Sequence, residues 1–158
     1  MSDRKAEIRR YLEATRADLL SSLQGLSPDD WDRPVVSGEG AWTIRQALAH
    51  VATAEPGQMA TGERMLKGEA RLGEGFSLDF WNQRQVEKRK GRSLDDLLND
   101  LADSRKKLLA WIDGLSEADF EKSGQHGRGD VITVEQLCYR VGEHEAGHAA
   151  EIRAALGK

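Results

Sequence analysis

Two histidines near the end of the chain have a spacing that could hold a metal ion. His144 and His148 lie four residues apart in the segment HEAGH, so their imidazoles leave the same face of a helix. Leu137 and Val141 before them and Ile152 after them share that spacing, which predicts an apolar, buried face. A buried polar group without a partner costs roughly 1–3 kcal/mol, and one divalent ion would satisfy both rings.

The same segment also matches the H-E-x-x-H signature of zinc proteases, in which the glutamate is the general base. That class takes a third ligand further along the chain, yet no histidine follows His148, so we do not favour the protease interpretation. Glu145 is either a base beside the metal or, as we expect, an exposed residue about 100° around the helix from His144. Glu151 either orients an imidazole or forms a helix-end salt bridge. Both glutamates are weak candidates for a catalytic role.

A third histidine lies on another expected helix. His50 is flanked at helical spacing by Ala47 and Ala54, whose small side chains leave room for the ring to reach a facing helix. With His144 and His148 it would form a three-histidine site that keeps open positions for water or substrate, as catalytic zinc sites do. The alternative is that each ring is a hydrogen-bonded core residue.

Several further residues are candidates for roles around this site. His126 falls in a glycine-rich loop, where exposure is the expectation and a place at the site mouth the alternative. Glu55 is a weaker candidate for orienting a ligand. Cys138 lies off the histidine face by spacing and is expected in the core. Three tryptophans are expected in the core or the pocket wall: Trp42, Trp81 and Trp111.

Apolar residues recur at helical spacing through most of the chain. Pro56-Gly57 should kink or interrupt the second helix, because proline lacks a backbone donor and clashes with the preceding turn. The segments Val35-Val36 and Val131-Ile132 favour β-structure but are too short to build a sheet. The expected helices cover residues 3–24, 43–67, 77–90, 93–113 and 133–156.

The sequence contains an internal repeat. GLSPDDWD at residues 25–32 parallels GLSEADFE at 114–121, and WTIRQALAHV parallels ITVEQLCYRV further along. Arg16 aligns with Arg105 in the helices before these turns. Two such helical hairpins facing each other predict an all-α, up-and-down four-helix bundle with a pseudo-twofold internal repeat and an extra short helix, in a single domain over residues 1–158.

Composition limits the class of partner that we expect. The net charge is −4 and no block is strongly basic, which argues against a nucleic-acid partner. No apolar run approaches the roughly 20 residues of a membrane span. One cysteine excludes an internal disulfide, and the first residues lack the apolar region of a signal peptide, so a cytoplasmic location is expected.

Three segments of the chain resemble the helix motifs of the DinB-like superfamily of metal-binding four-helix bundles. They are AWTIRQALAHVATAE, the middle stretch from DFWNQ to GLSEADF, and EHEAGHAAEIRAAL; the middle is similar to the DinB_2 and ClbS/DfsB-type members. The resemblance covers essentially the whole chain. It implies that His50, His144 and His148 occupy the three metal-ligand positions of that family, whose activities include thiol-dependent transfer, isomerisation, metal-dependent hydrolysis and protection against a genotoxin.

Together these observations predict a divalent-metal-dependent enzyme that acts on a small molecule by hydrolysis or thiol-dependent transfer. The metal would be a Lewis acid that activates water or a thiol, and histidine ligation suits zinc, nickel or iron. A low-molecular-weight thiol would present carboxylates to Arg45, Arg140 or His126. The alternative is a non-catalytic protein that sequesters a small molecule. A homodimer through the bundle faces is compatible with either.

Overall fold

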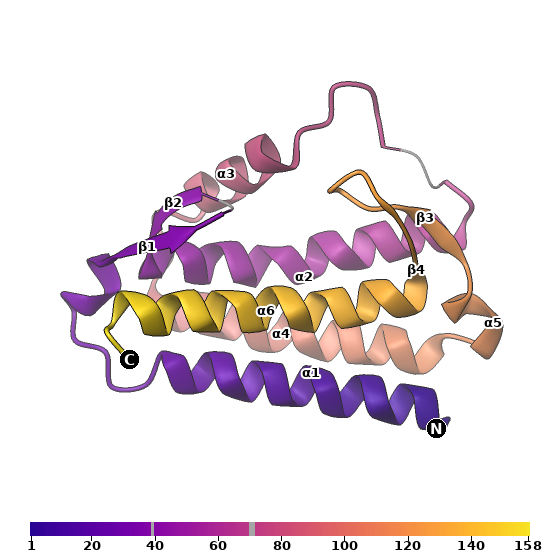
Figure 1. The fold of residues 1–158 in the computed structure, drawn as a ribbon, viewed down its shortest axis with the longest axis horizontal. Helices are drawn as coiled ribbons and strands as arrows, with labels where there is room; N and C mark the ends of the chain where they lie inside the picture. Colours follow the sequence, from indigo (N-terminus) through magenta and orange to yellow (C-terminus); the bar gives the residue numbers. More distant parts are fainter. Residues whose placement is uncertain (39, 70–71) are drawn as a thin grey trace.

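Four long helices run side by side along the molecule (Figure 1). The structure is a computed structural model that describes residues 1–38, 40–69 and 72–158. None of its helices is both long and apolar enough to cross a membrane. The bundle helices are α1 (Asp3–Ser22), α2 (Ile44–Leu66), α4 (Leu94–Gly114) and α6 (Val134–Ala155).

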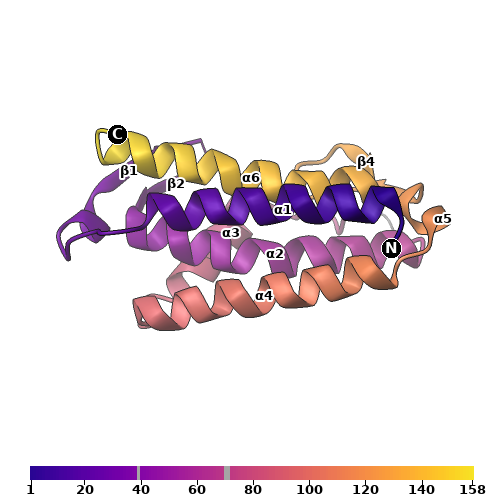
Figure 2. The same ribbon diagram turned by 90° about the horizontal axis from the view of Figure 1, so that it is seen from below.

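The predicted all-α four-helix bundle is confirmed, and its topology differs in one respect from the expected up-and-down order. Helices α1 and α6 run in one direction and α2 and α4 in the other (Figure 2), so α2 and α4 are parallel neighbours. The extra helix α3 (Leu78–Lys88) accounts for this, because it carries the chain back over the bundle before α4 begins (Figure 1). A long return of this kind replaces the short loop that strict alternation needs.

Each half of the chain also contains a short helix and a two-stranded antiparallel hairpin. The first half has η1 (Asp30–Asp32), β1 (Pro34–Ser37) and β2 (Gly40–Thr43); the second has α5 (Glu117–Phe120), β3 (Ser123–Gln125) and β4 (Val131–Thr133). The expectation that the two valine-containing segments build no sheet was therefore wrong. Val35 pairs with Trp42 and Ile132 with Gly124, and packing against the adjacent helices supports hairpins that would be marginal alone.

The internal repeat is visible in how the second helix of each half begins. Thr43 caps α2 and Thr133 caps α6, and each forms a reciprocal capping box with the glutamine three residues later. These boxes satisfy two backbone donors that a helix start leaves open. The two units therefore share the order helix, short helix, hairpin and capped helix, as the pseudo-twofold repeat requires.

Pro56 lies inside α2, so the interruption of the helix that was one of the two expected outcomes does not occur. The helix is continuous from Ile44 to Leu66, although proline removes one hydrogen bond and costs about 3 kcal/mol in a helix interior. Packing of α2 against α3, α4 and α6 outweighs that local cost. The following Gly57 leaves room for the ring of Trp81, because a Cβ there would lie 3.1 Å from Trp81 Cη2.

The core of the bundle contains two apolar clusters, one toward each end of the helices. A buried ionic network lies between the two clusters. Leu19, Leu48, Leu97 and Ile152 belong to one cluster. The second cluster lies toward the other end of the bundle and includes Ile8, Leu12, Leu108, Ile112 and Leu137.

The ionic network joins all four long helices through two arginines and two glutamates. Arg16 on α1 pairs with Glu55 on α2 at 2.9 Å and also with Glu145 on α6. Arg105 on α4 pairs with Glu145 at 2.8 Å and also with Glu55. All four are at most 8% exposed, so the charges are neutralised by one another and not by solvent.

Hydroxyl groups complete the network and follow the symmetry of the repeat. Thr15 donates to Glu145 Oε2 at 3.1 Å and Ser104 donates to Glu55 Oε2 at 3.0 Å. Thr15 and Ser104 each precede one of the paired arginines. The two halves of the chain thus contribute equivalent residues to a network that neither half could form alone.

We expect Glu55→Leu to lower the free energy of unfolding by about 3–5 kcal/mol, because it leaves a buried arginine charge uncompensated. Glu145→Leu should cost about the same, since it occupies the equivalent position. The control is Glu63→Leu, a half-buried site on the same helix. Urea unfolding followed by circular dichroism measures the difference, and a cost within about 1 kcal/mol of the control would contradict the assigned role.

Candidate metal centre

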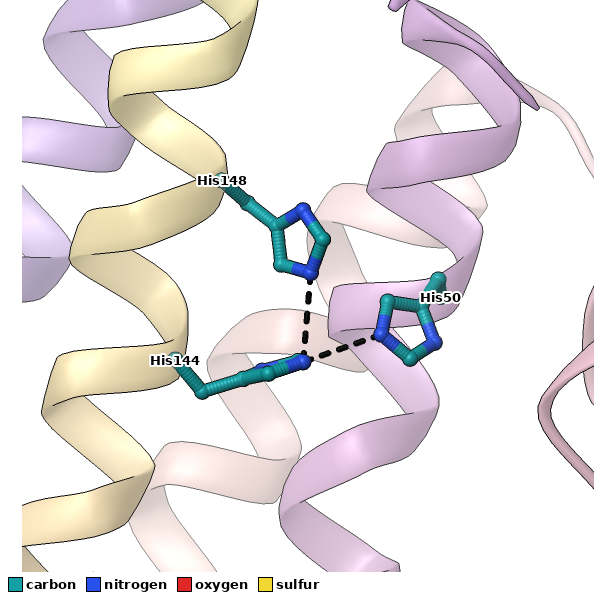
Figure 3. Close-up of side chains that lie close together, drawn as sticks. All are labelled: His50, His144 and His148. Atoms are coloured by element: carbon teal, nitrogen blue, oxygen red, sulfur yellow. Dashed lines mark hydrogen bonds between the residues drawn. The ribbon is translucent and has the colours of Figure 1, made fainter. Parts of the chain in front are cut away.

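Three histidine rings from two helices meet at one point in the bundle. His50 projects from α2 toward His144 and His148, which project from successive turns of α6 (Figure 3). His144 Nε2 lies 2.9 Å from His50 Nε2 and 3.1 Å from His148 Nε2. His50 and His148 are only 2% and 3% exposed. The structure therefore brings together all three histidines that the sequence singled out.

The three ring nitrogens fit a divalent metal ion as a donor set. The available ligand atoms all lie within 4.8 Å of one another, whereas nitrogens bound tetrahedrally to zinc lie about 3.3 Å apart. One nitrogen, His144 Nε2, is approached by both neighbours, yet it holds only one proton or one lone pair. His144 Nε2 can therefore form a good hydrogen bond with only one of the two neighbouring rings. A metal ion shared by the cluster would instead bind all three rings.

Two neighbouring side chains hold the rings in place. The Trp42 ring packs on the His50 ring with centroids 4.5 Å apart. Glu151 Oε2 lies 2.8 Å from His148 Nδ1, so the carboxylate accepts the Nδ1 proton and leaves Nε2 directed at the other histidines. Glu151 takes the orienting position that was one of its two expected roles, and such carboxylates also raise the basicity of a metal-binding imidazole.

Glu145 does not have the exposed position that was expected for it. The residue is 2% exposed, and its two carboxylate oxygens are engaged by Arg16, Arg105 and Thr15. Glu55, the weaker candidate for orienting a ligand, belongs to the same network. Both glutamates lie on the helices predicted for them, but helical spacing does not show that two arginines from other helices reach them.

A pocket opens on one side of the histidines, between α2, α3 and the loop that joins β3 to β4. It encloses about 760 Å³, part of it open to solvent, and His50 and His144 border it. Trp81 and Phe76 form part of its wall, so Trp81 has the wall position expected for it. Trp42 and Trp111 pack elsewhere, on His50 and against Gly62.

Polar residues of this pocket were largely missed from the sequence. Gln58, Arg64, Asn82 and Arg128 all line it, and no motif marked them. Gln58 and Arg64 follow His50 on the same helix, so helical spacing could have indicated them. Asn82 and Arg128 come from α3 and from a hairpin loop, whose positions depend on tertiary packing.

His126 is buried in the pocket wall. The expectation of an exposed histidine, drawn from the glycine-rich loop, was therefore wrong. It is 4% exposed, its Nε2 lies 2.9 Å from Gln58 Oε1, and its Nδ1 accepts the backbone N–H of Arg128. Burial, followed by the positive charge of Arg140, lowers the pKa of His126 to about 4. The ring is therefore neutral at pH 7.

The other residues that the sequence indicated, Arg140, Arg45 and Cys138, do not line this pocket. Arg140 pairs with Asp130 at 2.7 Å and borders a second, small cavity that His144 and His148 also line. Arg45 is not among the residues that line the described pockets. Cys138 is buried as expected, and burial raises the pKa of its thiol to about 12, which excludes a thiolate nucleophile at neutral pH.

The chain belongs to the DinB superfamily, whose model matches residues 11–152. The expected membership of the DinB-like bundles is thereby confirmed. Among curated proteins no sequence match is found.

Solved structures share the fold over nearly the whole chain. YfiT from Bacillus subtilis, described as a probable metal-dependent hydrolase with an unusual four-helix bundle topology, is 21% identical with a TM-score of 0.71, covering 99% of this chain and 90% of YfiT. The colibactin self-resistance protein ClbS, solved with double-stranded DNA, is 13% identical with a TM-score of 0.77, covering 98% and 96%.

A third structure is that of the mycothiol-dependent maleylpyruvate isomerase, which is 14% identical with a TM-score of 0.76. The match covers 96% of this chain but only 63% of the isomerase, so this chain spans about two thirds of that protein's length.

The ClbS structure corrects one expectation drawn from composition. The net charge of −4 predicts no nucleic-acid partner, yet a protein with this fold has been solved in complex with double-stranded DNA. That prediction is wrong because net charge averages over the whole surface, whereas phosphate contacts depend on local cationic groups.

We expect His126 to titrate near pH 4, which nuclear magnetic resonance can follow through its ring protons. The unfolded chain takes up this proton near pH 6.5, so the stabilising contribution of the neutral ring is complete above that pH and is lost as the pH falls toward 4. A His126→Gln variant should lack this part of the pH dependence of unfolding. A folded-state titration at or above 6.5 would contradict the assigned burial.

Proposed function

We propose that this protein is a divalent-metal-dependent enzyme that acts on a small molecule by hydrolysis or thiol-dependent transfer, with the metal held by His50, His144 and His148. The observation that carries the proposal is the convergence of three imidazole nitrogens beside an open pocket. Bound there, a divalent ion would supply Lewis-acid chemistry to a substrate or to an attacking water or thiol.

The protein's own residues supply positioning for this chemistry. His50 is fixed by the ring of Trp42 and His148 by the carboxylate of Glu151, so two of the three ligands would need little rearrangement on binding. Trp81 and Phe76 give one side of the pocket an apolar lining. The opening between α3 and the β3–β4 loop admits a small molecule, and DinB superfamily membership together with the neighbouring hydrolase and isomerase structures supports such a role.

A second candidate function is non-catalytic sequestration of a small molecule in the same pocket. One observation favours it: no carboxylate lines the described part of this pocket, and Glu145 is held in ion pairs, so no acidic side chain is placed there as a general base. The two functions differ in their dependence on the histidines. A sequestering protein would bind its ligand equally well after they are replaced.

Metal analysis tests the proposed centre. After incubation with zinc or nickel and gel filtration, we expect about one ion per chain in the wild type. His50→Ala and His144→Ala should each lose the ion, while His126→Ala should retain it because His126 is bonded to Gln58 and not to the cluster. Stoichiometric metal that persists in both cluster variants would exclude this site. Metal-dependent turnover in a panel of esters, amides and thiol–electrophile pairs would distinguish enzyme from binder.

The carboxylate of Glu151 should influence metal affinity through His148. We expect Glu151→Ala to weaken zinc binding by about 10–100-fold, because the Nδ1 proton loses its acceptor, and Glu151→Gln to weaken it less. Glu143→Ala is the matched control, an exposed glutamate on the same helix. Competition with a chromophoric chelator measures these affinities, and equal affinities for Glu151→Ala and the control would remove this role from Glu151.

A further inference from the structure

The pocket beside the histidines is positively charged in a chain of net negative charge. The sequence has 27 acidic residues against 23 lysines and arginines, yet no acidic side chain lines the described part of this pocket. Two arginines, Arg64 and Arg128, do line it. The charged side chains that line the pocket therefore favour an anion, although the whole chain carries a net negative charge.

Arg64 offers its charge to the pocket without a competing carboxylate. The guanidinium donates to the Thr61 hydroxyl at 3.2 Å, and that hydroxyl in turn donates to the carbonyl of Gly57 at 3.1 Å. Within residues 1–38, 40–69 and 72–158, no carboxylate forms an ion pair with Arg64. An anion is therefore the partner that this side chain can still take, and arginine binds carboxylates and phosphates through paired donors.

His126 determines which polar group Gln58 presents. The backbone N–H of Arg128 donates to His126 Nδ1 at 3.1 Å, so the ring proton lies on Nε2 and is donated to Gln58 Oε1 at 2.9 Å. With its carbonyl oxygen occupied, Gln58 has its NH₂ group left for a ligand. This residue too is set to bind a hydrogen-bond acceptor.

Asn82 is a second polar side chain that faces the space in which a ligand would lie. The side chain is 5% exposed and lines the pocket, and it forms no hydrogen bond to any residue that the structure describes. Its amide therefore faces the pocket and is available to a polar atom of a bound molecule.

Apolar and aromatic side chains also line the pocket. The Trp81 ring lies against the helix at Gly57, where even a Cβ would approach it to 3.1 Å, and Phe76 and Leu78 continue the wall. Planar rings bind such surfaces through offset or edge contacts. The pocket therefore combines an aromatic wall with donors that are directed at an acceptor.

We infer that this pocket binds a small organic anion, a carboxylate, sulfonate or phosphate carried on a planar apolar body. The anionic group lies against Arg64 and Gln58, and the body lies on Trp81. Only one part rests on the proposed function, namely that the reacting end of the ligand lies toward His50 and His144. The anion-binding groups themselves belong to the protein and need no metal.

Calorimetric titration of the full chain with 2-naphthoate and its neutral isostere 2-naphthamide tests this inference. We expect metal-free wild-type protein to bind the anion at least about tenfold more tightly than the amide, as a charge-assisted pair would give. Arg64→Gln should abolish that preference and Arg64→Lys should keep part of it. Arg84→Gln is the matched control, because Arg84 lies over the Phe80 ring on α3 and outside the pocket.

The outcomes separate this inference from the proposed metal centre. Equal affinity for the two compounds, or a preference that survives in Arg64→Gln, overturns the anion site. A preference that is absent without metal and appears with zinc also overturns it, because the ion is then the anion receptor. A preference that depends on Arg64 in a protein that binds no metal supports the anion site and contradicts the metal centre alone.

Discussion

The buried network of Arg16, Arg105, Glu55 and Glu145 is the constraint on which the rest of the structure depends. A charge inside a helical bundle is costly unless it is paired and its remaining hydrogen-bonding groups are satisfied. Each arginine here contacts both glutamates, so the four charges are compensated only when all four helices are at one axial position. Apolar side chains can pack in several axial registers of the helices, whereas this ionic network is satisfied in only one of them.

That register places the histidines. Glu145 directly follows His144 in the sequence, and Glu55 lies on the same helix as His50. Fixing the two glutamates relative to each other therefore fixes α2 relative to α6, and the ring nitrogens converge on the adjacent face. The histidine cluster and the ionic network thus lie on the same pair of helices. The network uses equivalent residues of the two repeats, whereas the cluster does not.

The histidine cluster draws on residues that the repeat does not duplicate. In the alignment of α2 with α6, His50 corresponds to Arg140, His144 to Ala54 and His148 to Gln58. The network retains equivalent residues in both halves because it needs balanced charges. Of the residues equivalent to the histidines, Ala54 and Gln58 line the pocket, whereas Arg140 pairs with Asp130.

The helices, the repeat and the three histidines that meet could all be predicted from the sequence, because helical periodicity, capping residues and the HxxxH spacing are local signals. Tertiary structure alone decided the burial of Glu145 and His126, the continuity of α2 through Pro56, and the parallel arrangement of α2 and α4. Each of these depends on a partner distant in the chain: arginines from two other helices, a hairpin folded over the pocket, or a returning α3. Spacing along one helix carries no information about which side chain of another element reaches it.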